Sequence, residues 1–117
     1  MSRTSELYLQ DIIECCENVK DYIGKCSFDE FSGDKKTIDA VVRNLEIIGE
    51  AVKNIPDEVR HTKPKIEWKK VARFRDVIVH HYFKVDLEVV WDVVINRLPE
   101  LETAAGEILI ERAKRKE

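Results

Sequence analysis

The sequence predicts an all-α protein, in which residues 1–117 form a single domain folded as an antiparallel bundle of four to five helices. Apolar residues recur at steps of three and four along several segments, which is the period of a helix with one buried face. With 4 Gly and 3 Pro, the chain has too few turn residues for a β-sandwich. A content of 44% hydrophobic and 37% charged residues fits a globular domain with a charged outer face and excludes a disordered chain.

The first helix is predicted from about Ser5 to Ile23, and Gly24 is expected to end it. Directly afterwards, Ser27 and Glu30 have the spacing of a capping box, which predicts a short helical turn. The apolar stripe of the first helix consists of Leu9, Ile12, Ile13, Cys16, Val19 and Ile23.

The second helix has the most regular pattern, with Asp34 as its expected N-cap and Pro56 ending the periodicity. Gly49 lies in the middle of its apolar face, where glycine costs about 1 kcal/mol of helix propensity relative to Ala. Either another helix backbone approaches closely at Gly49, or the glycine is simply tolerated. The face consists of Ile38, Val41, Val42, Leu45, Ile48, Gly49, Val52 and Ile55.

Residues 57–67 are polar and basic, contain Pro64, and are predicted to form a loop. A third helix is expected from about Trp68 to His80. Its apolar positions are Trp68, Val71, Ala72, Phe74, Val77, Ile78 and Val79.

A short connection from Lys84 to Asp86 is predicted next, with Asp86 as the cap of a fourth helix that begins at Leu87. Pro99 either kinks this helix or starts a fifth helix at its first turn. The stripe of the fourth helix is Leu87, Val90, Trp91, Val94, Leu98 and Leu101, and the final stripe is Leu101, Ala104, Ala105, Ile108 and Leu109.

Positive charge is concentrated in one part of an otherwise acidic chain. The formal net charge is -3, but residues 60–75, called the basic segment below, hold seven basic residues and one acid, a net +6. Such a segment can attract phosphate, although it can equally be a solvated loop and helix face. The basic residues are Arg60, Lys63, Lys65, Lys69, Lys70, Arg73 and Arg75.

The cysteines and the lack of long apolar runs indicate a cytoplasmic protein. Cys15, Cys16 and Cys26 are odd in number and lack the C-x-x-C spacing of metal or redox sites, so we expect reduced thiols, two of them in a helix, that act as small apolar side chains. The chain starts without the apolar run of a signal peptide, and no stretch is long enough to span a bilayer. We therefore expect no membrane association.

The cluster richest in chemistry runs from Arg75 to Tyr82, with His80 and His81 between them. The spacing H-E-x-x-H is absent, and adjacent histidines on a helix point about 100° apart, so we expect no metal and no other cofactor. Serine or cysteine nucleophile signatures and glycine-rich phosphate loops are also missing. A structural interpretation also stands, because Asp76 and His80 are four residues apart and could simply pair.

An arginine and a histidine suffice for RNA cleavage without a metal. The ribose 2′-hydroxyl is the nucleophile, a histidine can take or return a proton, and a guanidinium stabilises the charge that gathers at phosphorus. Arg75 and His80 are five residues apart, roughly 140° around a helix, so they do not share a face. Either the helix loosens near His80, or the site forms between two copies of the chain.

Arg75, His80 and Tyr82 satisfy the pattern R-x-x-x-x-H-x-Y, which resembles the signature of HepT-like proteins in the HEPN superfamily. Residues 31–56 resemble the second helix of that family, and residues 66–91 resemble its third helix and the opening of the fourth. The resemblance covers most of the chain and implies a HEPN-like helical bundle that dimerises.

The resemblance also implies a function. HepT-like proteins are metal-independent ribonuclease toxins, which implies that Arg75 binds the scissile phosphate and that His80 is the general acid or base. Their usual antitoxin is a minimal nucleotidyltransferase of the MntA type that transfers AMP to the motif tyrosine, here Tyr82. Added bulk and negative charge beside the cleft would then repel RNA.

Further residues are expected to assist this site. Asp76 and His81 flank the motif histidine and are expected to support it, whereas Lys69, Lys70 and Arg73 are expected to bind RNA. Two alternatives remain: a non-catalytic helical module that binds nucleotides or docks the transferase, and a purely structural bundle.

Overall fold

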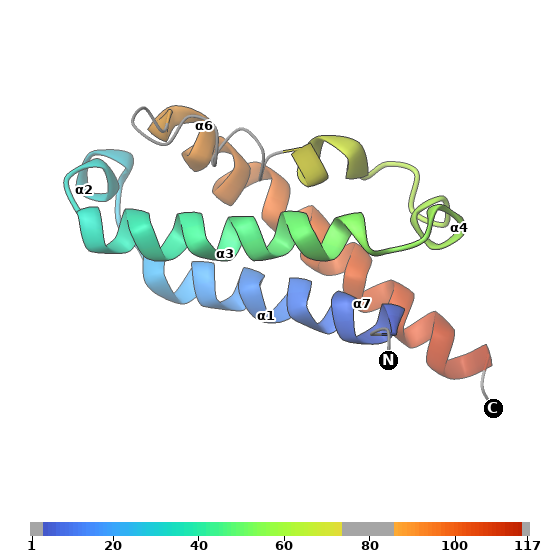
Figure 1. Ribbon diagram of the computed structural model, residues 1–117. Coiled ribbons are helices and arrows are strands. Elements are labelled where there is room, and N and C mark those ends of the chain that lie inside the picture. The colour runs from blue at the N-terminus through green and yellow to red at the C-terminus, as the bar shows by residue number, and fades with distance from the viewer. Residues whose placement is uncertain (1–3, 74–85, 116–117) are drawn as a thin grey trace.

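The computed structural model describes residues 4–73 and 86–115, and within these ranges the regular structure is entirely helical (Figure 1). The all-α prediction is therefore confirmed. Residues 68–73, called the lead helix below, are helical as well. The elements in chain order are α1 (Ser5–Ile23), α2 (Phe28–Ser32), α3 (Lys35–Lys53), α4 (Asp57–Arg60), α6 (Leu87–Asp92), the π-helix η1 (Val93–Arg97) and α7 (Leu98–Arg115).

Local capping sets the ends of the two helices that the sequence predicted best. The Thr4 hydroxyl accepts a hydrogen bond from the Leu7 N–H at the start of α1, and Gly24 ends α1 with a φ of 56°, a conformation that favours glycine. The Asp34 carboxylate accepts from the Thr37 N–H and begins α3. Both helices have the predicted boundaries to within two residues.

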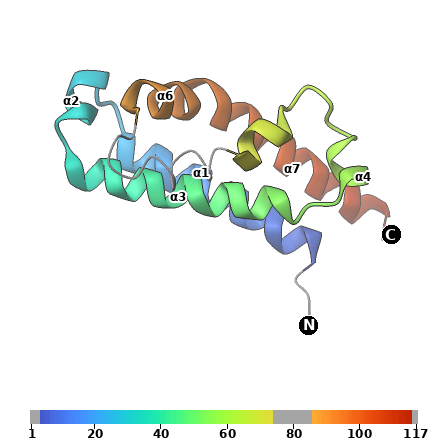
Figure 2. The same ribbon diagram turned by 45° about the horizontal axis from the view of Figure 1, so that its top comes forward.

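Three helices form the framework of the bundle. α1 and α3 lie side by side and run in opposite directions, while α7 packs against α1 and crosses the pair obliquely (Figures 1 and 2). Their apolar faces meet in one core, which is the physical reason for the three-to-four periodicity of the sequence. The largest fully buried side chains are Phe31, Leu9, Ile12, Leu45, Ile48, Ile55, Leu101, Ile108, Val19, Val41, Val52 and Val90.

An aromatic cluster joins α2 to α6 at one end of the bundle (Figure 1). The predicted capping box is present, with reciprocal hydrogen bonds of 3.1 and 3.0 Å between Ser27 and Glu30. It orients a short helix whose Phe31 is fully buried. The Trp91 ring lies 5.2 Å from that of Phe31 and 5.8 Å from that of Phe28, the latter edge-on.

Among residues 4–73 and 86–115, one polar side chain is buried in the core, which the periodicity of α3 did not predict. Asn44 is 7% exposed. It accepts a hydrogen bond from the Asn18 side chain at 3.2 Å and donates one to the Ala40 carbonyl at 2.9 Å. These bonds satisfy the buried amide and link α3 to α1.

The region around Pro99 fits the second of the two sequence alternatives, a helix with this proline in its first turn, with one difference. Pro99 is the second residue of α7, so it does begin a helix, but the preceding residues form a π-helix rather than an α-helix or a kink. Its signature is a hydrogen bond from the Leu98 N–H to the carbonyl of Val93, five residues earlier. Pro99 lacks an N–H and its ring would clash with the Ile95 carbonyl in an α-helix, and the wider π turn accommodates both effects.

The prediction of a loop over residues 57–67 is wrong in its first part. α4 occupies Asp57–Arg60, and Pro56 is its N-cap residue. An ion pair joins Arg60 to Asp57 within this turn. Val59 is 6% exposed, so the turn buries one apolar side chain in the core. A single helical turn is too short to produce a periodic pattern, which is why the sequence did not indicate it.

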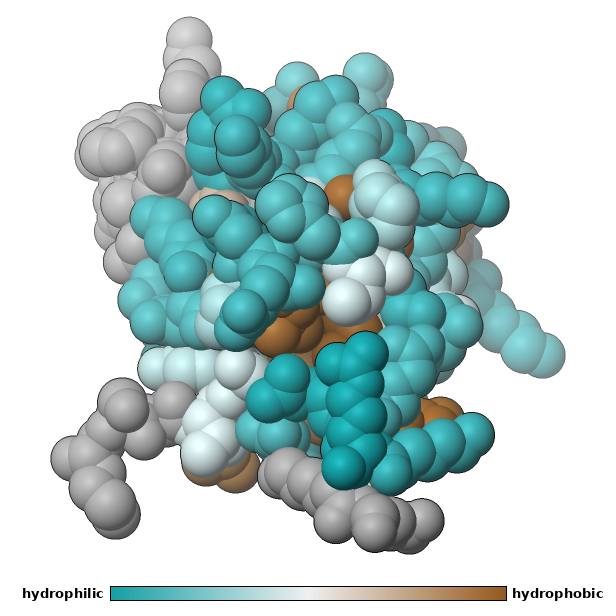
Figure 3. All heavy atoms as spheres, turned by 90° about the vertical axis from the view of Figure 1, so that its right-hand side faces the viewer, coloured by the Kyte–Doolittle hydropathy of each residue, from teal (hydrophilic) through white to brown (hydrophobic). Residues whose placement is uncertain are grey.

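Cys15 and Cys16 lie on α1 and are buried in the core of the protein, as predicted, and Cys26 is half-buried. Burial raises the pKa of Cys15 to about 11 and that of Cys16 to about 12, so both stay protonated at neutral pH. Within the described part of the chain, no helix has the length and apolarity needed to cross a membrane. Figure 3 shows a face of the molecule that is mostly hydrophilic, with small apolar patches.

Two glycines allow a matched test of the backbone. Gly24→Ala is expected to lower the free energy of unfolding by about 1–2 kcal/mol, because a Cβ strains a positive φ. Gly106→Ala is expected to raise it by about 0.5–1 kcal/mol, since Gly106 lies inside α7 and a Cβ added there would have no atom within 4 Å. Urea unfolding of the two variants measures both changes, and shifts of the same sign would contradict the assignment.

Candidate functional site

The motif residues Arg75, Asp76, His80, His81 and Tyr82 lie outside the described residues. Their relative positions, and the predicted continuation of the third helix to residue 80, stay predictions. The structure does describe both flanks, which are the lead helix on one side and α6 on the other. Both flanks pack on the core of the bundle.

The lead helix is fixed on its apolar side. Trp68 is 7% exposed and its indole N–H donates to the Lys63 carbonyl at 3.0 Å. The Glu67 carbonyl accepts from the N–H groups of Lys70 and Val71 and so closes the first turn. A buried Trp in the first turn therefore holds the start of the lead helix against the core.

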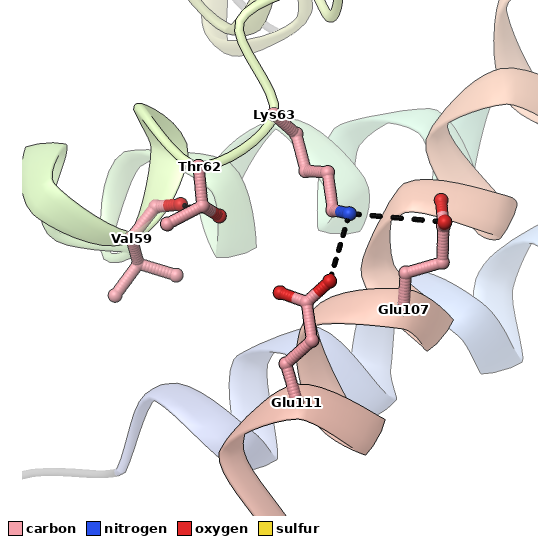
Figure 4. Close-up of polar contacts among 5 residues, drawn as sticks. All are labelled: Val59, Thr62, Lys63, Glu107 and Glu111. Atoms are coloured by element: carbon pink, nitrogen blue, oxygen red, sulfur yellow. Dashed lines mark hydrogen bonds and ion pairs between the residues drawn. The ribbon is translucent and has the colours of Figure 1, made fainter. Parts of the chain in front are cut away.

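The connection before the lead helix is tied to α7 (Figure 4). Lys63 reaches across to two carboxylates of α7, with its Nζ 3.0 Å from Glu111 Oε1 and 3.7 Å from Glu107 Oε2. The hydrogen bond to Glu111 raises the pKa of Lys63. Thr62 donates its hydroxyl to the Val59 carbonyl at 2.7 Å, which closes the end of α4.

Glu67 links the lead helix to η1. Its Oε1 lies 2.9 Å from Arg97 Nη1, and its Oε2 lies 2.7 Å from Lys70 Nζ. The hydrogen bond from Lys70, with a smaller contribution from Arg97, lowers the pKa of the Glu67 carboxyl. Sequence reasoning missed Arg97, because 30 residues separate it from Glu67 and only the fold brings them together.

The outgoing flank is equally well fixed. The Asp86 carboxylate accepts from the N–H groups of Glu88 at 3.0 Å and Val89 at 3.3 Å, as predicted for an N-cap. Val90 is 1% exposed, and Trp91 belongs to the aromatic cluster with α2. In the sequence, residues 74–85 therefore connect two elements that are both packed on the bundle.

The three residues expected to bind RNA are all exposed on the lead helix. Lys69 and Arg73 are one turn apart on the same face, and the Arg73 guanidinium donates to the Lys69 carbonyl at 3.4 Å. Within residues 4–73 and 86–115, neither makes an ion pair. Lys70 differs, because it shares Glu67 with Arg97.

A pocket of about 140 Å³ opens beside Glu67, Lys70 and Arg97. Its walls are apolar and come from α3, η1, α7 and the start of the lead helix, whereas its rim is charged. The rim consists of Glu67, Lys70, Arg97 and Glu100. Among the described residues, no cluster of three His, Cys, Asp or Glu side chains could hold a metal ion, and the expectation of metal-free chemistry stays a prediction.

Comparison with known proteins gives one family. The model of the family described as "Ribonuclease HepT-like" matches residues 12–108. A protein of Methanocaldococcus jannaschii named "Putative RNase" is 48% identical over 79% of this chain and 76% of its own length. "Probable ribonuclease HepT" of Thermococcus cleftensis is 44% identical over 87% of this chain and 93% of its own length. A "Putative RNase" of Caldanaerobacter subterraneus subsp. tengcongensis is 41% identical over 92% of this chain and 96% of its own length. No solved structure matches significantly.

The outgoing cap can be tested directly. Asp86→Ala removes the acceptor for two N–H groups and is expected to lower the free energy of unfolding by about 1 kcal/mol. Asp86→Ser keeps a capping oxygen and is the matched control, with a loss of a few tenths of a kcal/mol. Urea unfolding measures both, and equal losses would show that the cap does not hold the start of α6.

Proposed function

This chain belongs to the HepT-like ribonuclease family, and on that premise we propose that it is an endoribonuclease whose reacting side chains are Arg75 and His80. One observation carries the proposal: the family match over residues 12–108 includes the whole R-x-x-x-x-H-x-Y pattern. The described flanks support it, because they hold both ends of the motif-bearing segment on the bundle.

The proposed reaction uses the substrate's own 2′-hydroxyl. His80, as base, takes the proton of that hydroxyl, whose oxygen bonds to phosphorus while the bond to the leaving 5′-oxygen breaks. The leaving oxygen takes a proton from a solvent water molecule, and a 2′,3′-cyclic phosphate and a free 5′-hydroxyl result. Arg75 donates hydrogen bonds to the phosphate oxygens as negative charge gathers there, so no metal is required.

Substrate binding is assigned to the cations that precede Arg75. Lys69, Lys70 and Arg73 lie exposed on the lead helix, and two of them carry no carboxylate partner within the described residues. We assign to them contacts with backbone phosphates of the bound RNA. Asp76 and His81 flank the reacting groups and are proposed to support them.

A homodimer resolves the helical spacing of the motif. Arg75 and His80 lie roughly 140° apart if the helix continues, so one copy alone would not direct both side chains at one phosphate. We place the cleft between two copies related by a two-fold axis, so that each phosphate meets groups from both.

Control is proposed to act through Tyr82. A cognate nucleotidyltransferase of the MntA type would attach AMP to its hydroxyl, which makes this protein the toxin of a cytoplasmic toxin–antitoxin pair. The added phosphate carries negative charge beside a phosphate-binding cleft and would exclude RNA.

The proposed chemistry predicts the loss of cleavage in two variants. His80→Ala and Arg75→Ala are each expected to reduce RNA cleavage at least 10²-fold, because each removes a group that acts in the transition state. Lys65→Ala removes one exposed charge of the basic segment outside the lead helix and should stay within a few-fold of wild type. Gel analysis of a labelled RNA in the presence of EDTA measures the rates, and circular dichroism checks the fold. Wild-type rates in both motif variants would refute these roles.

The proposed control has its own test. Tyr82→Phe is expected to retain cleavage but to escape modification, because it lacks the hydroxyl that accepts AMP. Incubation with the transferase and ATP, followed by intact-mass analysis and a cleavage assay, separates the two effects. Full inhibition of Tyr82→Phe without an added AMP would show that the partner acts by occlusion instead.

A further inference from the structure

We propose that Lys70 and Arg97 form a binding site for a backbone phosphate of the RNA, and that Glu67 occupies this site in the free protein as a competing anion. The inference rests on the proposed function, because it concerns the same substrate. It adds a residue, Arg97, that lies outside both the motif and the basic segment.

Lys70 and Arg97 surround the Glu67 carboxylate as two cations would surround a bound phosphate. Lys70 contacts Oε2 of Glu67 and Arg97 contacts Oε1, so the two cations take one carboxylate oxygen each. Two unesterified oxygens of a phosphodiester offer the same pair of acceptors, and arginine and lysine are the side chains that bind them most often. The cations come from different elements, the lead helix and η1, and are therefore already converged before RNA arrives.

Exposure makes the carboxylate replaceable. The side chains of Glu67, Lys70 and Arg97 are 42%, 69% and 47% exposed. Ion pairs of this kind are weak and screened by salt, so an incoming phosphate can displace the carboxylate without opening the core. The low pKa of Glu67 keeps it ionised at neutral pH, so it competes as a full negative charge.

The position of Lys70 and Arg97 favours RNA as the source of the bound phosphate. Lys70 lies on the same short helix as Lys69 and Arg73, so Arg97 extends one cationic surface from the lead helix onto η1. The pocket beside it is apolar, so an anion would bind at the charged rim rather than inside. A phosphate at this rim would place the RNA strand along the exposed side of the lead helix.

The test compares RNA binding by two variants that break the same ion pair. In a His80→Ala background, which prevents cleavage, Arg97→Gln is expected to weaken binding roughly fivefold. It should also reduce the slope of log affinity against log salt by about 0.7, since one phosphate contact is lost. Glu67→Gln is expected to tighten binding by a similar factor, because the competing charge is gone. Fluorescence anisotropy with a labelled single-stranded RNA measures both.

Opposite signs distinguish this proposal from a purely structural ion pair. If the pair only held the lead helix in place, both variants would weaken binding together, and that result would overturn the proposal. Arg97→Lys keeps the charge and should restore most of the affinity, while thermal melts confirm that each variant is folded.

A neighbouring carboxylate provides the matched control. Glu100 lies on the same rim and is exposed, and its side chain makes no hydrogen bond or ion pair within the described residues. Glu100→Gln should therefore change the affinity much less than Glu67→Gln, and an equal gain would reduce the effect to general charge and overturn the site. No RNA binding by the His80→Ala parent would contradict the proposed function itself, whereas normal binding with unchanged affinity in both Glu67 and Arg97 variants would overturn this inference alone.

Discussion

Burial of one face of α1 between α3 and α7 is the contact on which the rest of the described structure depends. α3 and α7 both pack on α1, α2 contacts α3, and η1 continues directly into α7. The hydrogen-bonded Asn18–Asn44 pair adds a polar requirement to an otherwise apolar contact, and such a pair favours one register of the two helices over others. The lead helix and α6 pack on the same core through Trp68 and Val90.

Pro99 affects the surface of the protein as much as its backbone. In an uninterrupted α-helix from Leu87 to Arg115, the proline would lose a hydrogen bond and clash with the preceding turn, at a cost of about 3 kcal/mol. The π turn avoids the clash by widening the helix, and the extra residue in that turn changes which side chains share a face. Arg97 is the last residue of η1, and in this geometry it lies against Glu67. A backbone adjustment to one proline thus contributes to a charged group on the neighbouring helix.

The sequence predicted features whose causes are local and missed those whose causes are distant. α1 and α3 were predicted because their apolar periods are long, and the caps Ser27 and Asp34 were predicted because each acts on a residue three positions away. α4, η1 and the Glu67–Arg97 pair were missed, since a single turn gives no period and a pair 30 residues apart gives no pattern. The motif was found from its spacing and from the resemblance, which identify residues but not their arrangement. The arrangement of Arg75 and His80 stays a prediction, because both lie outside the described residues and the flanks alone do not determine it.

The charge of the basic segment is less available than its sequence indicates, and this bears on how an acidic protein binds RNA. Three of its seven cations are already paired with carboxylates in the described structure: Arg60, Lys63 and Lys70. Lys69 and Arg73 have no such partner among the described residues, and both lie on the helix face that precedes Arg75. The Debye length at physiological salt is about 8 Å, so at larger distances a net charge of -3 repels RNA only weakly. At shorter distances the local cations dominate. Under the proposed function, attraction is therefore short in range and favours strands that approach along the lead helix.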